Sequence, residues 1–370
     1  MIRPARLSLH VVELPLVHPF RTSFGEERVR RALLVALEAE GVTGWGECVA
    51  GSGPWYSYET VDTAWSIIRD VFVPLIRGKA FSHPRELPRA LARVRGHPMA
   101  KAALETALWD LHGRLQEKPL WELLGGVRDE VPAGVSIGIQ PDLPSLLDRI
   151  TGFLEQGYRR VKLKVKPGWD TDVLQAVRER FPDIPLSVDA NCAYTWEDAE
   201  HLRDFDRFEL MMIEQPLRHE DLVGHARLSR ELSTPICLDE SISSPHRAWE
   251  ALELSACRII NVKQGRVGGP TAALEIHALA QARGIPLWCG GMLETGIGRA
   301  LNAALASLPG FTLPHDISAT SRYYREDIAV PPFELSARGT IPVPQGPGLG
   351  VEVVPGRLLR WQTAAWSTEL

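Results

Sequence analysis

Five charged residues recur at nearly equal intervals along the middle of the chain, and their types could do chemistry together: Lys164, Asp189, Glu214, Asp239 and Lys263. They are separated by 25, 25, 25 and 24 residues. Each stands at or near the end of a short apolar segment. This interval fits one strand followed by one helix, so the pattern predicts one charged side chain per strand–helix unit.

Alternation within these segments predicts the direction in which the charges point. Lysines alternate with apolar residues in the stretch 161–166, so Lys162 and Lys164 share one face of a strand. The same alternation holds around Asp189 and Lys263. Repeated strand–helix units predict a barrel, in which the outer faces of the strands pack under helices. The apolar residues are therefore expected on the outside and the charged residues toward the barrel axis.

The three carboxylates predict a metal site. Asp189, Glu214 and Asp239 would repel one another on adjacent strands unless a cation joined them. Oxygen ligands with positions left open suit Mg²⁺ or Mn²⁺, whereas zinc prefers nitrogen and sulfur. One acid at a strand end is about as often a helix cap as a catalytic group. A set in register on consecutive strands favours a functional site.

Lysines flank the predicted carboxylates, with Lys162 and Lys164 on one side and Lys263 on the other. A lysine beside another cation and a divalent metal loses proton affinity, and a pKa of about 7–8 suits an acid or base. A metal with two opposed lysines fits removal of the proton α to a carboxylate, in which the metal stabilises the enediolate charge. One lysine would take the proton, and the other could return one to the opposite face.

The remaining elements predict an α/β protein, a (β/α)₈-type TIM barrel with an N-terminal α+β capping domain. Segments 7–17, 33–38 and 43–49 predict a small antiparallel sheet, and a leucine stripe within 99–116 predicts a helix. The pair Gly125-Gly126 closes a short helix and marks a boundary.

Beyond this boundary, eight short apolar segments alternate with amphipathic stretches, and the eighth is 311–316. This order is typical of a parallel (β/α)₈ barrel. A Rossmann-type fold is the competitor, but no G-x-G-x-x-G follows the first strand. The predicted divisions are 1–126 for the cap, 127–325 for the barrel and 326–370 for a C-terminal segment that returns to the cap.

Composition excludes several classes of protein. With 45% hydrophobic and 24% charged residues, the 370-residue chain is expected to be globular. A net charge of −5 argues against nucleic-acid binding. Five cysteines with no C-x-x-C pair argue against a disulfide framework or zinc ribbon, and those near strand ends are expected to be inert thiols. Without a signal-peptide core or a membrane-length apolar run, a cytoplasmic protein without membrane partners is expected.

The motifs that carry these charges resemble the enolase superfamily over nearly the whole chain. They are "KLK" (Lys162, Lys164), "DAN" (Asp189), "IEQP" (Glu214), "LDES" (Asp239) and "NVKQGRVGG" (Lys263). A lysine on the sixth strand, with no histidine in "LWCGGMLETG", is similar to the muconate-lactonizing subgroup and unlike mandelate racemases. "KLKVKPGWD", "DANCAYT", "WCGGMLETGIGRA" and "DISATSRYYRED" are similar to N-acylamino acid racemases, which are grouped with o-succinylbenzoate synthases.

This resemblance implies roles for individual residues. Lys164 and Lys263 would be the acid/base pair, and Lys162 would assist the substrate carboxylate, with Ser136 and Asn191 nearby. Gly291, Met292 and Leu293 would line the pocket for the acyl or succinyl chain. Cap loops 20–24 and 51–58 would close over the substrate and set specificity. His315 is expected to be structural or a substrate contact.

Two reactions fit the same residues, and the sequence leaves both open. Racemisation of an N-acylamino (N-succinylamino) acid uses one lysine per face. Dehydration of a cyclohexadiene precursor to o-succinylbenzoate, in menaquinone synthesis, needs Lys164 as the base and Lys263 to stabilise charge.

Further alternatives are a muconate cycloisomerase-type enzyme and a dipeptide epimerase, for which Asp316 is the one nearby acidic candidate. A non-catalytic ligand-binding barrel would be indicated by loss of a metal ligand or lysine, and none is lost. The resemblance also implies a small-molecule carboxylate substrate and a homo-oligomer, either an octamer or a dimer.

Overall fold

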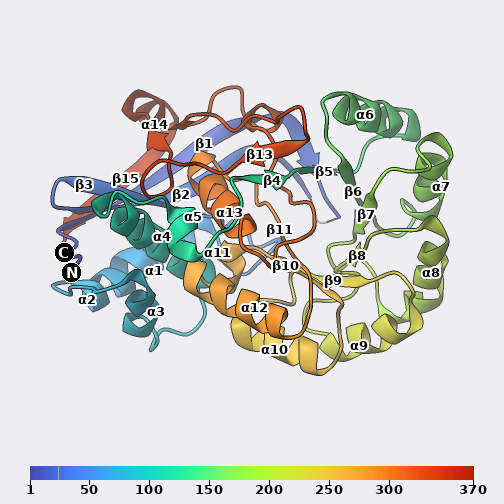
Figure 1. Cartoon of the computed structure of the whole chain (residues 1–370), viewed down its shortest axis with the longest axis horizontal. Helices are drawn as coiled ribbons and strands as arrows, with labels where there is room; N and C mark the ends of the chain where they lie inside the picture. The colour runs from blue at the N-terminus through green and yellow to red at the C-terminus, as the bar shows by residue number, and fades with distance from the viewer. Residues whose placement is uncertain (24) are drawn as a thin grey trace.

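The computed structural model describes residues 1–23 and 25–370 and contains two main sheets (Figure 1). One is a four-stranded antiparallel cap sheet near the two chain ends, and the other is a seven-stranded parallel sheet with helices outside it. The α/β class, with a capping domain and a modified TIM barrel, is confirmed. The divisions at residues 126 and 325 stay a proposal.

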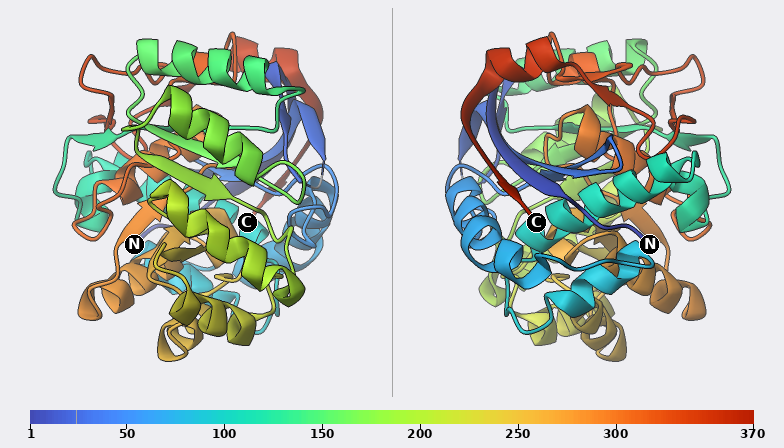
Figure 2. Two further views of the ribbon diagram at one scale, coloured as in Figure 1. Left: turned by 90° about the vertical axis from the view of Figure 1, so that its right-hand side faces the viewer. Right: turned by 90° about the vertical axis from the view of Figure 1, so that its left-hand side faces the viewer.

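The cap sheet has the strand order β15-β1-β2-β3. Its strands are β1 (Arg6–Arg21), β2 (Glu26–Ala39), β3 (Val42–Cys48) and β15 (Gln362–Glu369). Glu40 and Gly41, both with positive φ, form the two-residue turn between β2 and β3 that the sequence indicates. The last strand, β15, pairs antiparallel with β1, so both ends of the chain lie in one sheet (Figure 2).

Helix α4 (Pro98–Leu115), the helix predicted from its leucine stripe, packs on β3. Two glycines of β3 permit the contact. A Cβ atom added at Gly46 would lie 2.0 Å from the Ala103 carbonyl oxygen, and one at Gly44 would lie 2.3 Å from that of Ala107. The sheet and helix backbones therefore approach more closely than any side chain at these positions allows.

The parallel sheet has the order β11-β10-β9-β8-β7-β6-β5, so each strand lies beside the next in sequence. Its strands are β5 (Gly134–Ile137), β6 (Arg160–Lys164), β7 (Leu186–Asp189), β8 (Ile213–Glu214), β9 (Ile236–Leu238), β10 (Ile259–Val262) and β11 (Leu287–Cys289). The helices between and after them are α6 (Leu143–Glu155), α7 (Thr171–Arg180), α8 (Ala199–Arg203), α9 (Leu222–Glu231), α10 (Pro245–Glu253), α11 (Gln264–Val267), α12 (Pro270–Ala282) and α13 (Gly296–Ala306). Their apolar faces form one core with the outward residues of the strands.

The prediction of a regular eighth barrel strand at 311–316 is wrong. This segment makes only two isolated parallel bridges, from Phe311 to Leu287 of β11 and from His315 to Ala133 before β5. Pro314 lies between the two bridges and has no N–H to donate, which interrupts a continuous ladder. The segment still spans the gap between β11 and β5, so the ring of strands is closed by isolated bridges.

Shorter elements complete the chain. They are α1 (Val61–Ile67), α2 (Val73–Ile76), α3 (Leu87–Ala90), α5 (Leu120–Leu124), β4 (Glu130–Pro132), β12 (Ala329–Val330), β13 (Thr340–Pro342), β14 (Glu352–Val353) and α14 (Pro355–Trp361). A single π-helical turn at 68–72 joins α1 to α2. In the described part of the chain, no helix is both long and apolar enough to cross a membrane.

Buried cap glutamates bind the N-termini of two barrel helices. Glu47 of β3 accepts hydrogen bonds from the backbone N–H groups of Thr295 and Gly298 at the start of α13. Glu105 of α4 accepts from the backbone N–H of Thr271 at the start of α12, at 3.1 Å. The positive ends of the helix dipoles favour these carboxylates, so the contacts fix the cap against the barrel.

Two glycine substitutions should change stability in opposite directions. Gly46→Ala should destabilise the protein by about 1–3 kcal/mol or more, because the new methyl group overlaps the α4 backbone. Gly152→Ala in α6 should stabilise it by roughly 0.5–1 kcal/mol, because the added methyl group meets no atom within 4 Å and alanine favours helix. Urea-unfolding midpoints of both variants measure this, and an unchanged midpoint for Gly46→Ala would contradict the close packing.

Candidate active site

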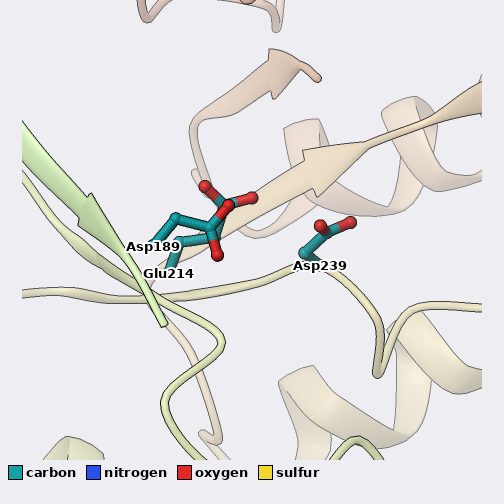
Figure 3. A group of neighbouring side chains, drawn as sticks. All are labelled: Asp189, Glu214 and Asp239. Atoms are coloured by element: carbon teal, nitrogen blue, oxygen red, sulfur yellow. The ribbon is translucent and has the colours of Figure 1, made fainter. Parts of the chain in front are cut away.

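Three carboxylates converge at the carboxyl ends of neighbouring strands, as predicted (Figure 3). Asp189 ends β7, Glu214 ends β8 and Asp239 directly follows β9. All three side chains are completely buried, and one oxygen from each lies within 4.8 Å of the others. Three hard oxygen ligands at this spacing fit a divalent cation such as Mg²⁺ or Mn²⁺. These three residues form the carboxylate arc.

Lysine ammonium groups contact the carboxylate arc from both ends. Lys164 of β6 lies 2.6 Å from an oxygen of Asp189, and Lys263, which follows β10, lies 2.8 Å from one of Asp239. These two lysines therefore come from the strands on either side of β7, β8 and β9. Lys162 lies 2.7 Å from Glu214, at the middle of the arc. The structure thus brings together all six charged residues singled out in the sequence.

Burial and neighbouring charges shift the pKa values of two carboxylates in the arc, Asp189 and Glu214. Burial raises the pKa of Asp189, but Lys164 and Lys162 lower it by more, so the net pKa lies well below its usual range. Burial and the neighbouring Asp189 raise the pKa of Glu214. A cation bound beside Glu214 would act against this rise, because it favours the ionised carboxylate.

The pKa of Lys162 is not lowered, contrary to the expectation for the lysines beside the carboxylates. Burial lowers the pKa of Lys162, but the carboxylates of Asp316, Glu214 and Asp189 outweigh it, and the net pKa is raised rather than lowered. A divalent cation among the carboxylates would act in the opposite direction, because it adds positive charge beside the ammonium group.

A cavity of ≈ 180 Å³ lies between cap and barrel, and its lining includes the three lysines that contact the carboxylate arc. All eight residues predicted as catalytic or substrate-binding line it: Ser136, Lys162, Lys164, Asn191, Lys263, Gly291, Met292 and Leu293. Described members of both cap loops also line it, including Phe20 and Trp55. Phe24, part of the first loop, lies outside the described residues. The roles of all these side chains stay proposals.

Of two predicted substrate contacts, Ser136 has a group available for a ligand, whereas Asn191 is engaged by its neighbours. The Ser136 hydroxyl is buried and has no hydrogen-bond partner among residues 1–23 and 25–370. Asn191 directs its side-chain oxygen to Lys164 at 2.7 Å and its amide to Glu240. Its backbone has a φ of 44°, a left-handed conformation that asparagine tolerates better than most residues. Asn191 is therefore held by its neighbours rather than free to rotate.

Several polar site residues were missed by sequence reasoning. Tyr56 donates to Asp239 at 3.0 Å, and Arg266 forms an ion pair with the same carboxylate. Asn261 donates to Glu214 at 2.6 Å. The alternation around Lys263 already placed Asn261 on the inward face of its strand, although without a role. Arg266 follows Lys263 by three residues within a quoted motif.

The residues given less functional weight are placed as follows. His315 accepts a hydrogen bond from the Cys289 backbone N–H and lies outside the cavity lining. All five cysteines are free, and burial raises the pKa of Cys237 and Cys289 well above the usual value, so they are poor nucleophiles. Asp316 is engaged by Lys162 and Arg160, at 2.7 and 2.8 Å.

Comparison with known families accounts for both parts of the chain. Residues 6–125 match the N-terminal domain of mandelate racemase / muconate lactonizing enzyme, and residues 145–356 match the enolase C-terminal domain-like family. The chain belongs to the enolase superfamily. The resemblance inferred from its motifs is confirmed.

Two activities are named among the relatives at about 50% identity. The chain is 52% identical to an o-succinylbenzoate synthase of Geobacillus kaustophilus, over 93% of this chain and 92% of the relative. It is 50% identical to an N-succinylamino acid racemase of Amycolatopsis sp, over 97% of both chains. Among solved structures, an enolase-superfamily member from Listeria innocua covers all of both chains with a TM-score of 0.96 at 39% identity.

Superfamily members use a divalent metal ion, and the carboxylate arc fits one. We expect the purified protein to bind about one Mn²⁺ per chain. Asp239→Asn should weaken that affinity by about tenfold or more, because a neutral amide replaces a buried anionic ligand. Titration of free Mn²⁺ by electron paramagnetic resonance measures both quantities.

Asp142→Asn is the matched control for this substitution. Asp142 caps α6 outside the site, and asparagine caps helices equally well, so Mn²⁺ affinity should not change. Equal affinity in the Asp239 variant and the wild type would remove that residue from the metal site.

Proposed function

We propose that this protein removes the proton α to a substrate carboxylate, and thereby racemises N-succinylamino acids, forms o-succinylbenzoate, or both. The observation that carries the proposal is the placement of Lys164 and Lys263 at opposite ends of the carboxylate arc, with both lysines lining one cavity. Relatives at about 50% identity that carry these two names support the choice of substrates.

The carboxylate arc would hold Mg²⁺ or Mn²⁺. When bound, the ion would supply Lewis-acid stabilisation of the negative charge that develops on the substrate carboxylate. Lys162 would assist from the protein side, because its ammonium group is buried at the middle of the arc and also lines the cavity. Ser136 would donate its unpaired hydroxyl to the same end of the substrate.

Racemisation then needs one neutral and one protonated lysine. The neutral lysine takes the α-proton, and the electrons of the broken C–H bond enter the enediolate. The protonated lysine donates its proton to the opposite face of the same carbon. The two lysines exchange protonation states in each turnover, so the reverse reaction uses the same residues in swapped roles.

Formation of o-succinylbenzoate uses the same first step. Lys164 would take the α-proton of the cyclohexadiene precursor, and the electrons of the C–H bond would enter the enediolate. The hydroxyl group on the same side would then leave as water with the proton held by Lys164, while Lys263 stabilises charge. Both reactions need the cavity to exclude bulk water, a role suited to the cap loops. A homo-oligomer, either a dimer or an octamer, and a cytoplasmic location stay predictions from the resemblance.

Deuterium exchange tests the shared step. Wild-type protein with Mg²⁺ in D₂O should remove the α-proton NMR signal of both N-succinyl-L-phenylalanine and N-succinyl-D-phenylalanine. A Lys164→Ala/Lys263→Ala double variant should exchange each enantiomer at least about 10³-fold more slowly, because both bases are lost. Lys166→Ala is the matched control, since Lys166 is not among the residues lining the cavity, and it should exchange at the wild-type rate.

The outcome also separates the two reactions. Exchange of both enantiomers supports racemisation. If the wild type exchanges neither enantiomer but forms o-succinylbenzoate from its precursor, the dehydration alone is retained. Absence of both reactions would overturn the proposed function.

A further inference from the structure

Arg30 is a buried cation in the cavity wall, and the roles proposed for the carboxylate arc and the lysines do not involve it. It lies on β2 of the cap sheet, opposite Leu14 of β1, and is only 2% exposed. Alternation along β2 places it on the same face as Ala32 and Leu34, which belong to the core shared with the barrel. Its side chain therefore points from the cap toward the barrel, where it lines the cavity.

The guanidinium group of Arg30 has two unused donors on one edge. Nε and Nη2 are buried and have no hydrogen-bond partner within residues 1–23 and 25–370. Nη1 lies 3.6 Å from a carboxylate oxygen of Glu27, which is longer than a hydrogen bond. Leaving buried donors unpaired is unfavourable. The Nε–Nη2 edge matches the two oxygens of a carboxylate.

A purely structural role for Arg30 does not account for these donors. The nearby buried acids are already satisfied by other groups. Glu47 accepts from Thr295 and Gly298, and Glu294 accepts from the Met292 backbone N–H and the Asn302 amide. In the described part of the chain, neither glutamate lies within ion-pair distance of Arg30.

The two activities named for the relatives share one chemical group. N-succinylamino acids and o-succinylbenzoate both carry a succinyl chain that ends in a carboxylate. The reacting end of the substrate is assigned to the lysines and the carboxylate arc, so the succinyl carboxylate needs a separate cation. We propose that Arg30 binds this distal carboxylate and makes the cavity selective for succinyl over neutral acyl groups. This inference rests on the proposed function for the orientation of the substrate.

Binding of two matched ligands tests the proposal without catalysis. N-succinylglycine and its terminal amide differ only at the distal carboxylate, and glycine has no stereocentre to racemise. By isothermal titration calorimetry with Mg²⁺, the wild type should bind the carboxylate about 30-fold or more tightly than the amide, as expected for a buried charge pair. Arg30→Met should reduce this preference to about threefold or less while leaving the affinity for the amide within about threefold of the wild type.

Two further variants control for folding and charge. Arg28→Met, on the same strand with a side chain 73% exposed, should keep the full preference. Arg30→Lys keeps the charge but loses the two-pronged edge, so it should retain a reduced preference. Thermal unfolding checks that each variant is folded. The comparison of the two ligands in the wild type needs no variant at all.

Other outcomes overturn this inference separately from the proposed function. The assignment of Arg30 is wrong if the wild type does not prefer the carboxylate, if Arg30→Met weakens both ligands equally, or if that variant keeps the preference. A wild type that shows the Arg30-dependent preference but neither exchanges α-protons nor forms o-succinylbenzoate would retain the binding assignment and reject the proposed reaction.

Discussion

The repulsion among three buried carboxylates is the constraint on which the rest of the site depends. Asp189, Glu214 and Asp239 have no exposed surface, so neighbouring cations rather than water must balance their charge. Lys162, Lys164, Lys263 and Arg266 do so, each through a direct contact with the arc. A divalent ion would compete with these cations for the same oxygens, and Lys162, Lys164 and Lys263 also line the cavity. Metal binding would therefore weaken the ion pairs of these lysines and leave their amino groups available to the substrate.

In the proposed function, the barrel supplies the reactive groups and the cap supplies the enclosure. Because the strand–helix units are nearly equal in length, each places one charged side chain at the same end of the barrel. The cap reaches over that end through Tyr56, which contacts Asp239, and through Arg30 on β2. Glu47 and Glu105 fix the cap to two barrel helices. The proposed catalytic residues therefore lie at the ends of barrel strands, while specificity is assigned to residues of the cap.

Sequence reasoning succeeded where a local pattern determines the structure. The regular spacing and alternation around Lys164 and Lys263 depend only on strand and helix lengths, so the barrel and its inward charges could be predicted. It failed at the eighth segment, where Pro314 permits bridges but no ladder. It placed loop 51–58 over the substrate but could not identify Arg30 or the contact of Tyr56 with Asp239. Both depend on how the cap docks, a long-range contact that no spacing in the sequence reports.

The central claim is that Lys164 and Lys263 act on opposite faces of one carbon. Enantiomer-resolved deuterium exchange with the single variants Lys164→Arg and Lys263→Arg tests it most directly. The account predicts that each variant loses exchange with one enantiomer of N-succinylphenylalanine and keeps it with the other, in complementary fashion, because the remaining lysine can still remove and return a proton on its own face. Loss of exchange with the same enantiomer in both variants would contradict the two-faced arrangement.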